Sequence, residues 1–154
     1  MAGQRGVRGF DAGKKVLGRK RHILVDTLGL LLAVEIQPAN VQDRDGAKAV
    51  LAHAHWFGNL KVVWVDGGYA GQLETWFAEQ RVGRSARLEV VRKPPGKGFH
   101  LLPKRWVVER TFAWLSRYRR LARDYEVKTS HAKAFTYVAA TRYMLRRLAT
   151  LSLP

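Results

Sequence analysis

The sequence contains no cysteine among its 154 residues, which excludes disulfide bonds and thiolate metal sites. No apolar run approaches the roughly 20 residues that a helix needs to cross a bilayer. The longest candidate, Leu28 to Ile36, is short and carries Glu35. The first ten residues have no apolar signal region. These absences predict a soluble, cytoplasmic protein.

Acidic residues are scarce, since 12 Asp and Glu stand against 28 Lys and Arg, and the net charge is +16. A surplus this large in a small domain is typical of proteins that bind polyanions, most often nucleic acid. Residues 1–25 hold seven Lys and Arg with one Asp, and residues 92–120 hold nine with one Glu. This uneven distribution predicts an oriented binding face. A ribosomal-type protein, or a basic chain without a partner, is the alternative.

Hydrophobic residues make up 47% of the sequence, and its length suits one domain, which would bury about 70% of the surface of its unfolded chain. Residues 1–18 are rich in Gly, Lys and Arg and predict an extended basic arm. Residues 19–149 carry the apolar patterns of a folded domain. Residues 150–154 are expected to form a tail.

Apolar patterning predicts two consecutive strands, residues 19–26 and 30–37, joined by a turn in which Gly29 takes a positive φ. So short a link makes an antiparallel hairpin. The order of elements predicts an α/β domain with a mixed central sheet flanked by helices. The further elements are strands at residues 60–65 and 88–93, and helices at residues 44–55, 71–80, 103–118 and 131–149.

The last two predicted helices carry aromatic, apolar and basic side chains. In the first of them, the aromatic residues are expected in the core rather than as stacking platforms for bases: Trp106, Phe112 and Trp114. In the second, helical spacing predicts that Phe135, Val138, Ala139 and Leu145 face inward, with Arg142, Arg146 and Arg147 on the polar side.

Two aspartates stand at predicted strand ends, each after four apolar residues: Asp26 after "HILV" and Asp66 after "VVWV". Ligands gather outside the carboxyl ends of strands in open α/β sheets, so both are candidate site residues. The alternative role for each aspartate is to start a turn. Glu109 is a third candidate, because helical spacing places it on or beside the inward face, where a carboxylate is costly without a partner or a metal. A salt bridge to Arg105 is its alternative.

Carboxylate oxygens are hard ligands, and Mg²⁺ is usually held by a few of them together with phosphate oxygens. Two such ions about 4 Å apart activate a water or hydroxyl and stabilise the leaving oxygen of a phosphodiester. Three carboxylates within a strongly basic chain therefore predict phosphoryl transfer on nucleic acid. The segment "GKKVLGRK" lacks the pattern of a phosphate-binding P-loop, so no ATP is expected.

Four segments resemble a known family: "GRKRHILVDTLGLLLAV", "ANVQDRDGA", "VWVDGGYAG" and "RWVVERTFAWLSRYRRLARDYE". They closely resemble the catalytic domain of DDE transposases from bacterial insertion sequences. The resemblance runs from about Asp11 to Leu148, and the motifs are long, in order and correctly spaced. It implies a ribonuclease H-like fold, catalytic and metal-binding roles for Asp26, Asp66 and Glu109, and Mg²⁺ or Mn²⁺ as cofactor, with two ions.

The sequence departs from the family pattern in two respects. Many relatives place a Tyr before the Arg that precedes the catalytic Glu, and here Arg105 fits but the Tyr position holds Leu102. The basic residue expected after the Glu is Arg117, at approximate spacing. Relatives also carry an N-terminal helical region, whereas this chain begins just before the first predicted strand. Three interpretations of the chain stay open: a fragment, a decayed copy, or the second reading frame of a two-frame element.

The resemblance implies double-stranded DNA as partner, at element ends and target, with a homo-oligomer on DNA or an N-terminal partner chain from an upstream frame. Bacterial, nucleoid-associated localisation follows from it. Two other functions stay open: a ribonuclease H-like nuclease, and a catalytically incomplete fragment that binds DNA or regulates the full-length enzyme. The candidate DNA contacts are Lys14, Lys15, Arg19, Arg21, Lys93, Lys97, Lys104, Arg105, Arg110 and Arg117.

Overall fold

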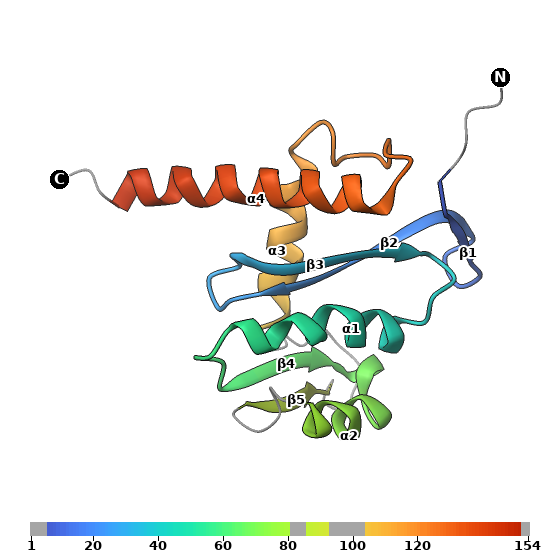
Figure 1. Cartoon of the computed structure of the whole chain (residues 1–154), viewed down its shortest axis with the longest axis vertical. Coiled ribbons are helices and arrows are strands. Elements are labelled where there is room, and N and C mark those ends of the chain that lie inside the picture. The colour runs from blue at the N-terminus through green and yellow to red at the C-terminus, as the bar shows by residue number, and fades with distance from the viewer. Residues whose placement is uncertain (1–5, 81–85, 93–103, 152–154) are drawn as a thin grey trace, which may run out of the picture.

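The computed structural model describes residues 6–80, 86–92 and 104–151. Strands and helices alternate along most of the chain (Figure 1), which confirms the predicted α/β class. The strands are β1 (Gly9–Asp11), β2 (Val16–Val25), β3 (Leu31–Pro38), β4 (Val62–Asp66) and β5 (Arg87–Val91). The helices are α1 (Asp43–Leu51), α2 (Gln72–Glu79), α3 (Arg105–Ser116) and α4 (Thr129–Leu151), with short 3₁₀ turns η1 (Ala52–Trp56) and η2 (Gly67–Tyr69).

The predicted hairpin forms, with β2 and β3 antiparallel from the pair Arg19↔Pro38 to the pair Val25↔Leu31. Its turn requires Gly29, which has a φ of 81° and lies against α3. There the Thr111 hydroxyl lies 2.8 Å from the carbonyl oxygen of Gly29 and donates a hydrogen bond to it. The hairpin is therefore fixed to α3 at its turn.

The strands form two sheets in the described part of the chain, where a single mixed sheet was expected. One is antiparallel, in the order β1-β2-β3, and the other pairs β4 with β5 in parallel. Both kinds of pairing are present, but no hydrogen-bonded ladder joins β2 to β4 among the described residues.

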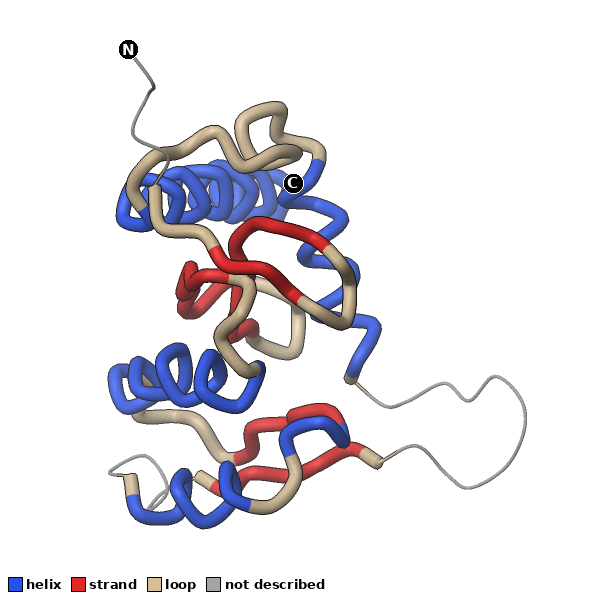
Figure 2. Tube along the Cα trace, turned by 90° about the vertical axis from the view of Figure 1, so that its right-hand side faces the viewer, coloured by secondary structure: helices blue, strands red, loops and turns tan. Residues whose placement is uncertain are grey.

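Helices cover both faces of the β2–β3 hairpin (Figures 1 and 2). On one face, a core cluster joins Leu24 and Ala33 to α1 and extends to Val63 of β4 and Phe77 of α2. On the other face, Val34 and Ile36 pack against small residues of α4. The first cluster holds the two sheets together, because it contains residues of both.

The structure differs from the sequence expectations near both ends. Residues 9–18, expected within an extended arm, form β1 and the start of β2. The helix α4 continues to Leu151, beyond the expected domain end. The domain boundaries themselves stay a prediction. No helix in the described ranges is long and apolar enough to cross a membrane.

The expected inward face of α4 is wrong at three positions. Phe135, Val138 and Leu145 are exposed. The face that packs inward carries small residues instead: Ala132, Thr136, Ala139 and Ala140. Small side chains allow the helix to approach the hairpin closely, so packing distance rather than residue hydrophobicity sets its orientation.

Two charged side chains connect distant segments. Arg19 of β2 is almost fully buried and donates to both the carboxylate of Asp124 and the carbonyl of Glu126. Glu35 of β3 accepts hydrogen bonds from Lys133 of α4 and from His53 at 2.7 Å. Burial of Glu35 acts to raise its pKa, but the hydrogen bonds from Lys133 and His53 outweigh it and lower the pKa below its ordinary value.

Candidate active site

Asp66 ends β4 and begins the 3₁₀ turn η2. The preceding residues are β-branched and aromatic, which favours a strand, and Gly67 and Gly68 end it. The Oδ1 atom of Asp66 accepts a hydrogen bond from the backbone N–H of Gly68 at 3.1 Å. The side chain is exposed, so its second oxygen remains available to a ligand at the end of the strand.

Glu109 lies on the second turn of α3 and is exposed, which corrects the expectation that it lies on or beside the inward face. The helix packs instead through Val107, Thr111 and Leu115, which are buried at a spacing of four residues. This packing places Glu109 on the solvent side. The glutamate is therefore accessible to a ligand without the desolvation cost that burial would bring.

Asp66 and Glu109 line the same cavity of about 550 Å³, which we call the Asp66–Glu109 cavity. Three basic residues, Lys14, Arg21 and Lys104, also line it. A pair of carboxylates beside three cations suits a ligand that is a metal-bound anion, because the acids hold the metal and the bases hold the anion.

Burial shifts the pKa values of three residues of this cavity: Arg21, His22 and Tyr69. Burial lowers the pKa of Arg21, whose Nε atom has no hydrogen-bond partner among the described residues. Burial, aided by the charges of Asp43 and Asp66, raises the pKa of Tyr69 to about 12. Tyr69 therefore stays neutral at physiological pH and offers a hydroxyl donor beside Asp66.

Asp26 does not line the Asp66–Glu109 cavity. It lies at a neighbouring cavity of about 350 Å³, and its Oδ1 atom accepts the backbone N–H groups of Leu28 and Leu30, each at 2.8 Å. These bonds form the turn of the β2–β3 hairpin, as the alternative interpretation of this residue expected. Its role as a metal ligand stays a prediction.

The donor set fits a hard divalent cation in part. Asp66 and Glu109 supply carboxylate oxygens to one cavity, and Mg²⁺ completes its coordination with water and phosphate oxygens. Within the described ranges, however, no group of three His, Cys, Asp or Glu is arranged to hold a metal. The two carboxylates therefore suit a metal that a substrate phosphate also binds.

The predicted DNA contacts divide into three groups. Lys14, Arg21 and Lys104 line the Asp66–Glu109 cavity, and Lys104 also lies 5.5 Å from the ring centre of Trp64. Lys15 is exposed outside it. Outside the described residues are Lys93, Lys97 and the side chain of Arg105.

Two predicted DNA contacts bind groups of the protein itself, and their contact with DNA stays a prediction. Arg19 is buried in the contacts with Asp124 described above. Arg110 donates to the carbonyl oxygen of Leu28 at 2.8 Å, and its guanidinium lies between the rings of Trp106 and Trp114, at 4.3 and 4.7 Å. Both arginines are thereby occupied by protein groups. Trp106, expected in the core, is exposed and covers Arg110.

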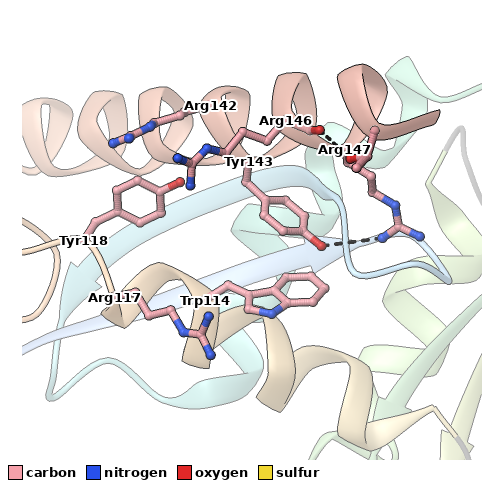
Figure 3. Close-up of a pocket in the computed structure, with 8 residues that line it drawn as sticks. Trp114, Arg117, Tyr118, Arg142, Tyr143, Arg146 and Arg147 are labelled. Carbon is pink, nitrogen blue, oxygen red and sulfur yellow. Dashed lines mark hydrogen bonds between the residues drawn. The ribbon is translucent and has the colours of Figure 1, made fainter. Parts of the chain in front are cut away.

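Arg117 lines a second basic site, which we call the arginine pocket (Figure 3). This pocket of about 550 Å³ lies between the end of α3 and α4. Its floor contains Tyr143 stacked on Trp114, with ring centres 4.3 Å apart. The described lining residues include no carboxylate; they are Trp114, Arg117, Tyr118, Arg142, Tyr143, Arg146, Arg147 and Thr150.

Sequence reasoning treated Arg142, Arg146 and Arg147 as the polar side of a helix and did not count them as DNA contacts. Arg142 and Arg146 are four residues apart, which puts these two on one side of α4. That signal was present in the sequence. The contribution of Arg117 from α3 was not, because it depends on how the two helices pack.

Comparison with known proteins identifies the family of the chain. The family described as "Transposase DDE domain" matches residues 1–145. A relative from Burkholderia cepacia, described as a putative transposase for insertion sequence element IS402, is 30% identical over 128 residues. The match covers 77% of this chain and 58% of the relative, so the chain spans little more than half of the relative's length. No solved structure matches the chain significantly.

The family match extends over nearly the whole chain and includes both carboxylates of the Asp66–Glu109 cavity. The relative covers most of the same residues. The α/β fold class is consistent with this similarity, and the roles of the strand-end aspartate and the helix glutamate stay predictions. The chain therefore belongs to the Transposase DDE domain family.

Proposed function

We propose that the chain is the catalytic part of a DNA transposase that cleaves DNA at insertion-sequence ends and transfers the freed 3′ ends into target DNA. One observation carries the proposal: Asp66 and Glu109, from a strand end and a helix far apart in sequence, line one cavity with three cations. Family membership supports the same chemistry. A ribonuclease H-like fold is part of the proposal, because its catalytic carboxylates likewise stand at strand ends and on a helix.

The proposed cofactor is Mg²⁺ or Mn²⁺, as two ions, held by Asp66 and Glu109, with Asp26 as the predicted third ligand. Such ions, when bound, activate a water or a 3′ hydroxyl and stabilise the leaving oxygen. The basic residues of the chain itself act on the substrate rather than on the metal. Lys14, Arg21 and Lys104 bind and orient the scissile phosphate at the cavity.

The proposed partner is double-stranded DNA, as element ends and target. The proposal includes a homo-oligomer of the chain on DNA, because two element ends must be held together for transposition. Its alternative is a partner chain that carries the N-terminal region of longer relatives. A nucleoid-associated location in a bacterial cytoplasm follows from it. The net charge of +16 supports a polyanionic partner.

The purified chain is expected to nick a supercoiled plasmid bearing insertion-sequence ends when Mg²⁺ or Mn²⁺ is present, and to leave it intact in EDTA. Gel analysis of nicked and linear products measures this reaction. An RNA–DNA hybrid and a plasmid without such ends are the control substrates. Cleavage of the hybrid without preference for the ends favours a ribonuclease H-like nuclease, and DNA binding without cleavage by any ion favours the regulatory fragment.

The arginine pocket is proposed as a second DNA contact, which grips a phosphate away from the cleavage site. Guanidinium groups bind phosphate oxygens through paired hydrogen bonds, and four arginines line this pocket without a carboxylate among the described lining residues. The stacked rings of Tyr143 and Trp114 lie beside these arginines. Such a contact adds affinity without reading sequence.

A double substitution, Arg142→Ala with Arg146→Ala, is expected to weaken DNA binding equally for all sequences. The slope of log affinity against log salt falls by about one for each arginine that leaves a phosphate. Fluorescence anisotropy of a labelled duplex at several KCl concentrations measures this slope. The matched control is Arg44→Ala with Arg123→Ala, two exposed arginines outside the pocket. Equal weakening in both pairs contradicts a defined pocket and indicates diffuse attraction.

A further inference from the structure

The turn between β2 and β3, residues 26–30, is held from two sides, and we call it the Asp26 turn. On its own side, the Oδ1 atom of Asp26 accepts the backbone N–H groups of Leu28 and Leu30. On the other side, Arg110 of α3 donates to the carbonyl oxygen of Leu28 at 2.8 Å. The backbone of Leu28 therefore links the Asp26 carboxylate to the Arg110 guanidinium.

Arg110 lies between two residues of α3 that have different surroundings. Glu109 precedes it and lines the cavity of the candidate active site, while Thr111 follows it and donates to the carbonyl oxygen of Gly29. Thr111 is 3% exposed, so its bond to the turn is shielded from water. The helix thus carries Glu109 and, at the next two positions, two side chains that bind the Asp26 turn. The placement of the turn relative to Glu109 depends on these bonds.

Two tryptophans hold the guanidinium of Arg110. Its Cζ atom lies 4.3 Å from the ring centre of Trp106 and 4.7 Å from that of Trp114, distances at which a cation is attracted to an aromatic face. Its Nε atom is buried without a hydrogen-bond partner among the described residues. Trp114 in turn stacks on Tyr143 of α4 (Figure 3). These ring contacts fix the guanidinium and therefore the N–H group that reaches Leu28.

The Asp26 turn lies close against α3. A Cβ atom added to Gly29 would lie 2.8 Å from the hydroxyl oxygen of Thr111 and 3.4 Å from a guanidinium nitrogen of Arg110. The turn therefore has no room to move toward the helix, and the two hydrogen bonds from α3 oppose its movement away. Its position is defined in both directions.

We propose that Arg110 is a positioning residue that fixes the Asp26 turn to α3 and so sets the separation between Asp26 and Glu109. The inference rests on the proposed function, in which both carboxylates bind the metal ions. Arg110 acts through Asp26, and it is not among the described residues that line either cavity. A planar guanidinium suits this role because it stacks on rings and directs its N–H groups in fixed directions, which a lysine ammonium does not.

The alternative role of Arg110, predicted from the sequence, is a direct contact with a DNA phosphate. A phosphate contact adds to the affinity for DNA and to its salt dependence. A positioning residue changes the rate of cleavage and leaves affinity and salt dependence as they are. The contacts with two rings and a carbonyl favour positioning, because they already hold the guanidinium in the absence of DNA.

Arg110→Lys is the first test, because it keeps the charge and removes the planar group. In the chain without DNA or metal, amides of the Asp26 turn are expected to exchange with deuterium about tenfold faster than in the unsubstituted chain, because the turn loses its fixed neighbour. Amides of β4 keep their rates and serve as the internal control. Unchanged exchange in the turn overturns the inference, and this readout does not depend on DNA cleavage.

Arg120→Lys is the matched control. Arg120 also lies over an aromatic ring, 4.9 Å from the centre of Phe135, and donates to Glu126 at 2.6 Å. It is not among the described residues that line either cavity. The substitution removes contacts of the same kinds away from the Asp26 turn. It is therefore expected to leave both the exchange of the turn and the rate of cleavage unchanged.

Cleavage and binding give the second readout. At saturating DNA, Arg110→Lys is expected to lower the single-turnover rate of cleavage about 10- to 100-fold, since a misplacement of about 1 Å suffices for such a loss. A normal rate overturns the inference. Arg110→Ala is expected to leave the slope of log affinity against log salt unchanged. A slope reduced by about one assigns Arg110 to a phosphate and also overturns the inference.

The double variant Arg110→Lys with Asp26→Asn shows whether Arg110 acts through Asp26. It is expected to cleave no more slowly than Asp26→Asn alone, because the carboxylate that Arg110 positions is already lost. An additive loss means that Arg110 acts by another route, which overturns the inference. If the unsubstituted chain cleaves no DNA with any ion, the proposed function fails, and the exchange measurement still decides whether Arg110 positions the turn.

Discussion

Asp66→Asn is expected to abolish metal-dependent DNA cleavage, with a loss of at least about 100-fold, while DNA binding persists. The substitution replaces an anionic oxygen with a neutral amide, so the metal loses charge compensation at the end of β4. The fold is expected to remain, because the Oδ1 atom of Asn accepts the Gly68 N–H as Asp66 does. Plasmid nicking in Mg²⁺ or Mn²⁺ measures the loss, and retention on a DNA column measures binding.

Glu79→Gln is the matched control for this prediction, since Glu79 is an exposed acid at the end of α2 and lines neither cavity. It makes the same change in net charge and is expected to cleave normally. Glu109→Gln is expected to lose cleavage as Asp66→Asn does. Cleavage by Asp66→Asn at the rate of the unsubstituted chain would falsify the role proposed for this carboxylate.

Asp26→Asn tests whether Asp26 binds a metal or serves only to form the turn. Both N–H groups that stabilise the turn bond to Oδ1, an atom that asparagine keeps, so the hairpin is expected to form. If Asp26 completes the ligand set, as the family resemblance implies, cleavage falls with Asp66→Asn. Unchanged cleavage assigns Asp26 to the turn alone, and the third metal ligand must then be a residue other than Asp26, Asp66 and Glu109.

Phe77→Ala is expected to lower the free energy of unfolding by about 3–5 kcal/mol. Phe77 is 1% exposed and belongs to the core cluster that joins α2 to β4 and to the β2–β3 hairpin. Removing its ring loses the transfer free energy of the side chain and leaves a cavity in the cluster that holds the two sheets together. Urea unfolding followed by circular dichroism measures the change as a lower midpoint.

Phe10→Ala is the control for this effect, because Phe10 is 55% exposed on the short strand β1. Its cost is expected to stay within about 0.5 kcal/mol, as for most surface substitutions. A similar cost at both positions contradicts the assignment of Phe77 to the centre of the core. A reduced midpoint also predicts faster loss of cleavage on heating, since the same cluster positions β4 and therefore Asp66.

Local patterns predicted the elements well where each element's own residues determine it. The β2–β3 hairpin follows from two apolar runs around Gly29, the one residue of its turn that takes a positive φ without strain. Strand β4 follows from a run of β-branched and aromatic residues that stops at two glycines. Helix α3 was predicted to within about two residues at each end, which is the usual uncertainty of helix ends.

Predictions failed where packing between elements decides the outcome. The inward face of α4 was predicted from the largest apolar residues, but close approach to the hairpin selects Ala132, Ala139 and Ala140. The contacts of Arg110 with two tryptophans and the Leu28 carbonyl were not predicted either, and its contact with DNA stays a prediction. Neither result can be read from spacing within one helix, because the deciding partners lie on other elements.

The sequence by itself determined the α/β class, the strong positive charge and the residues at the element ends, because these depend on composition and on neighbours within a few positions. Only the tertiary structure decided which carboxylates meet. It brings Asp66 and Glu109 to one cavity and leaves Asp26 at the hairpin turn. The physical reason is that a strand-end aspartate can bind either a distant ligand or the N–H groups that follow it, and the packing around each strand end selects between them.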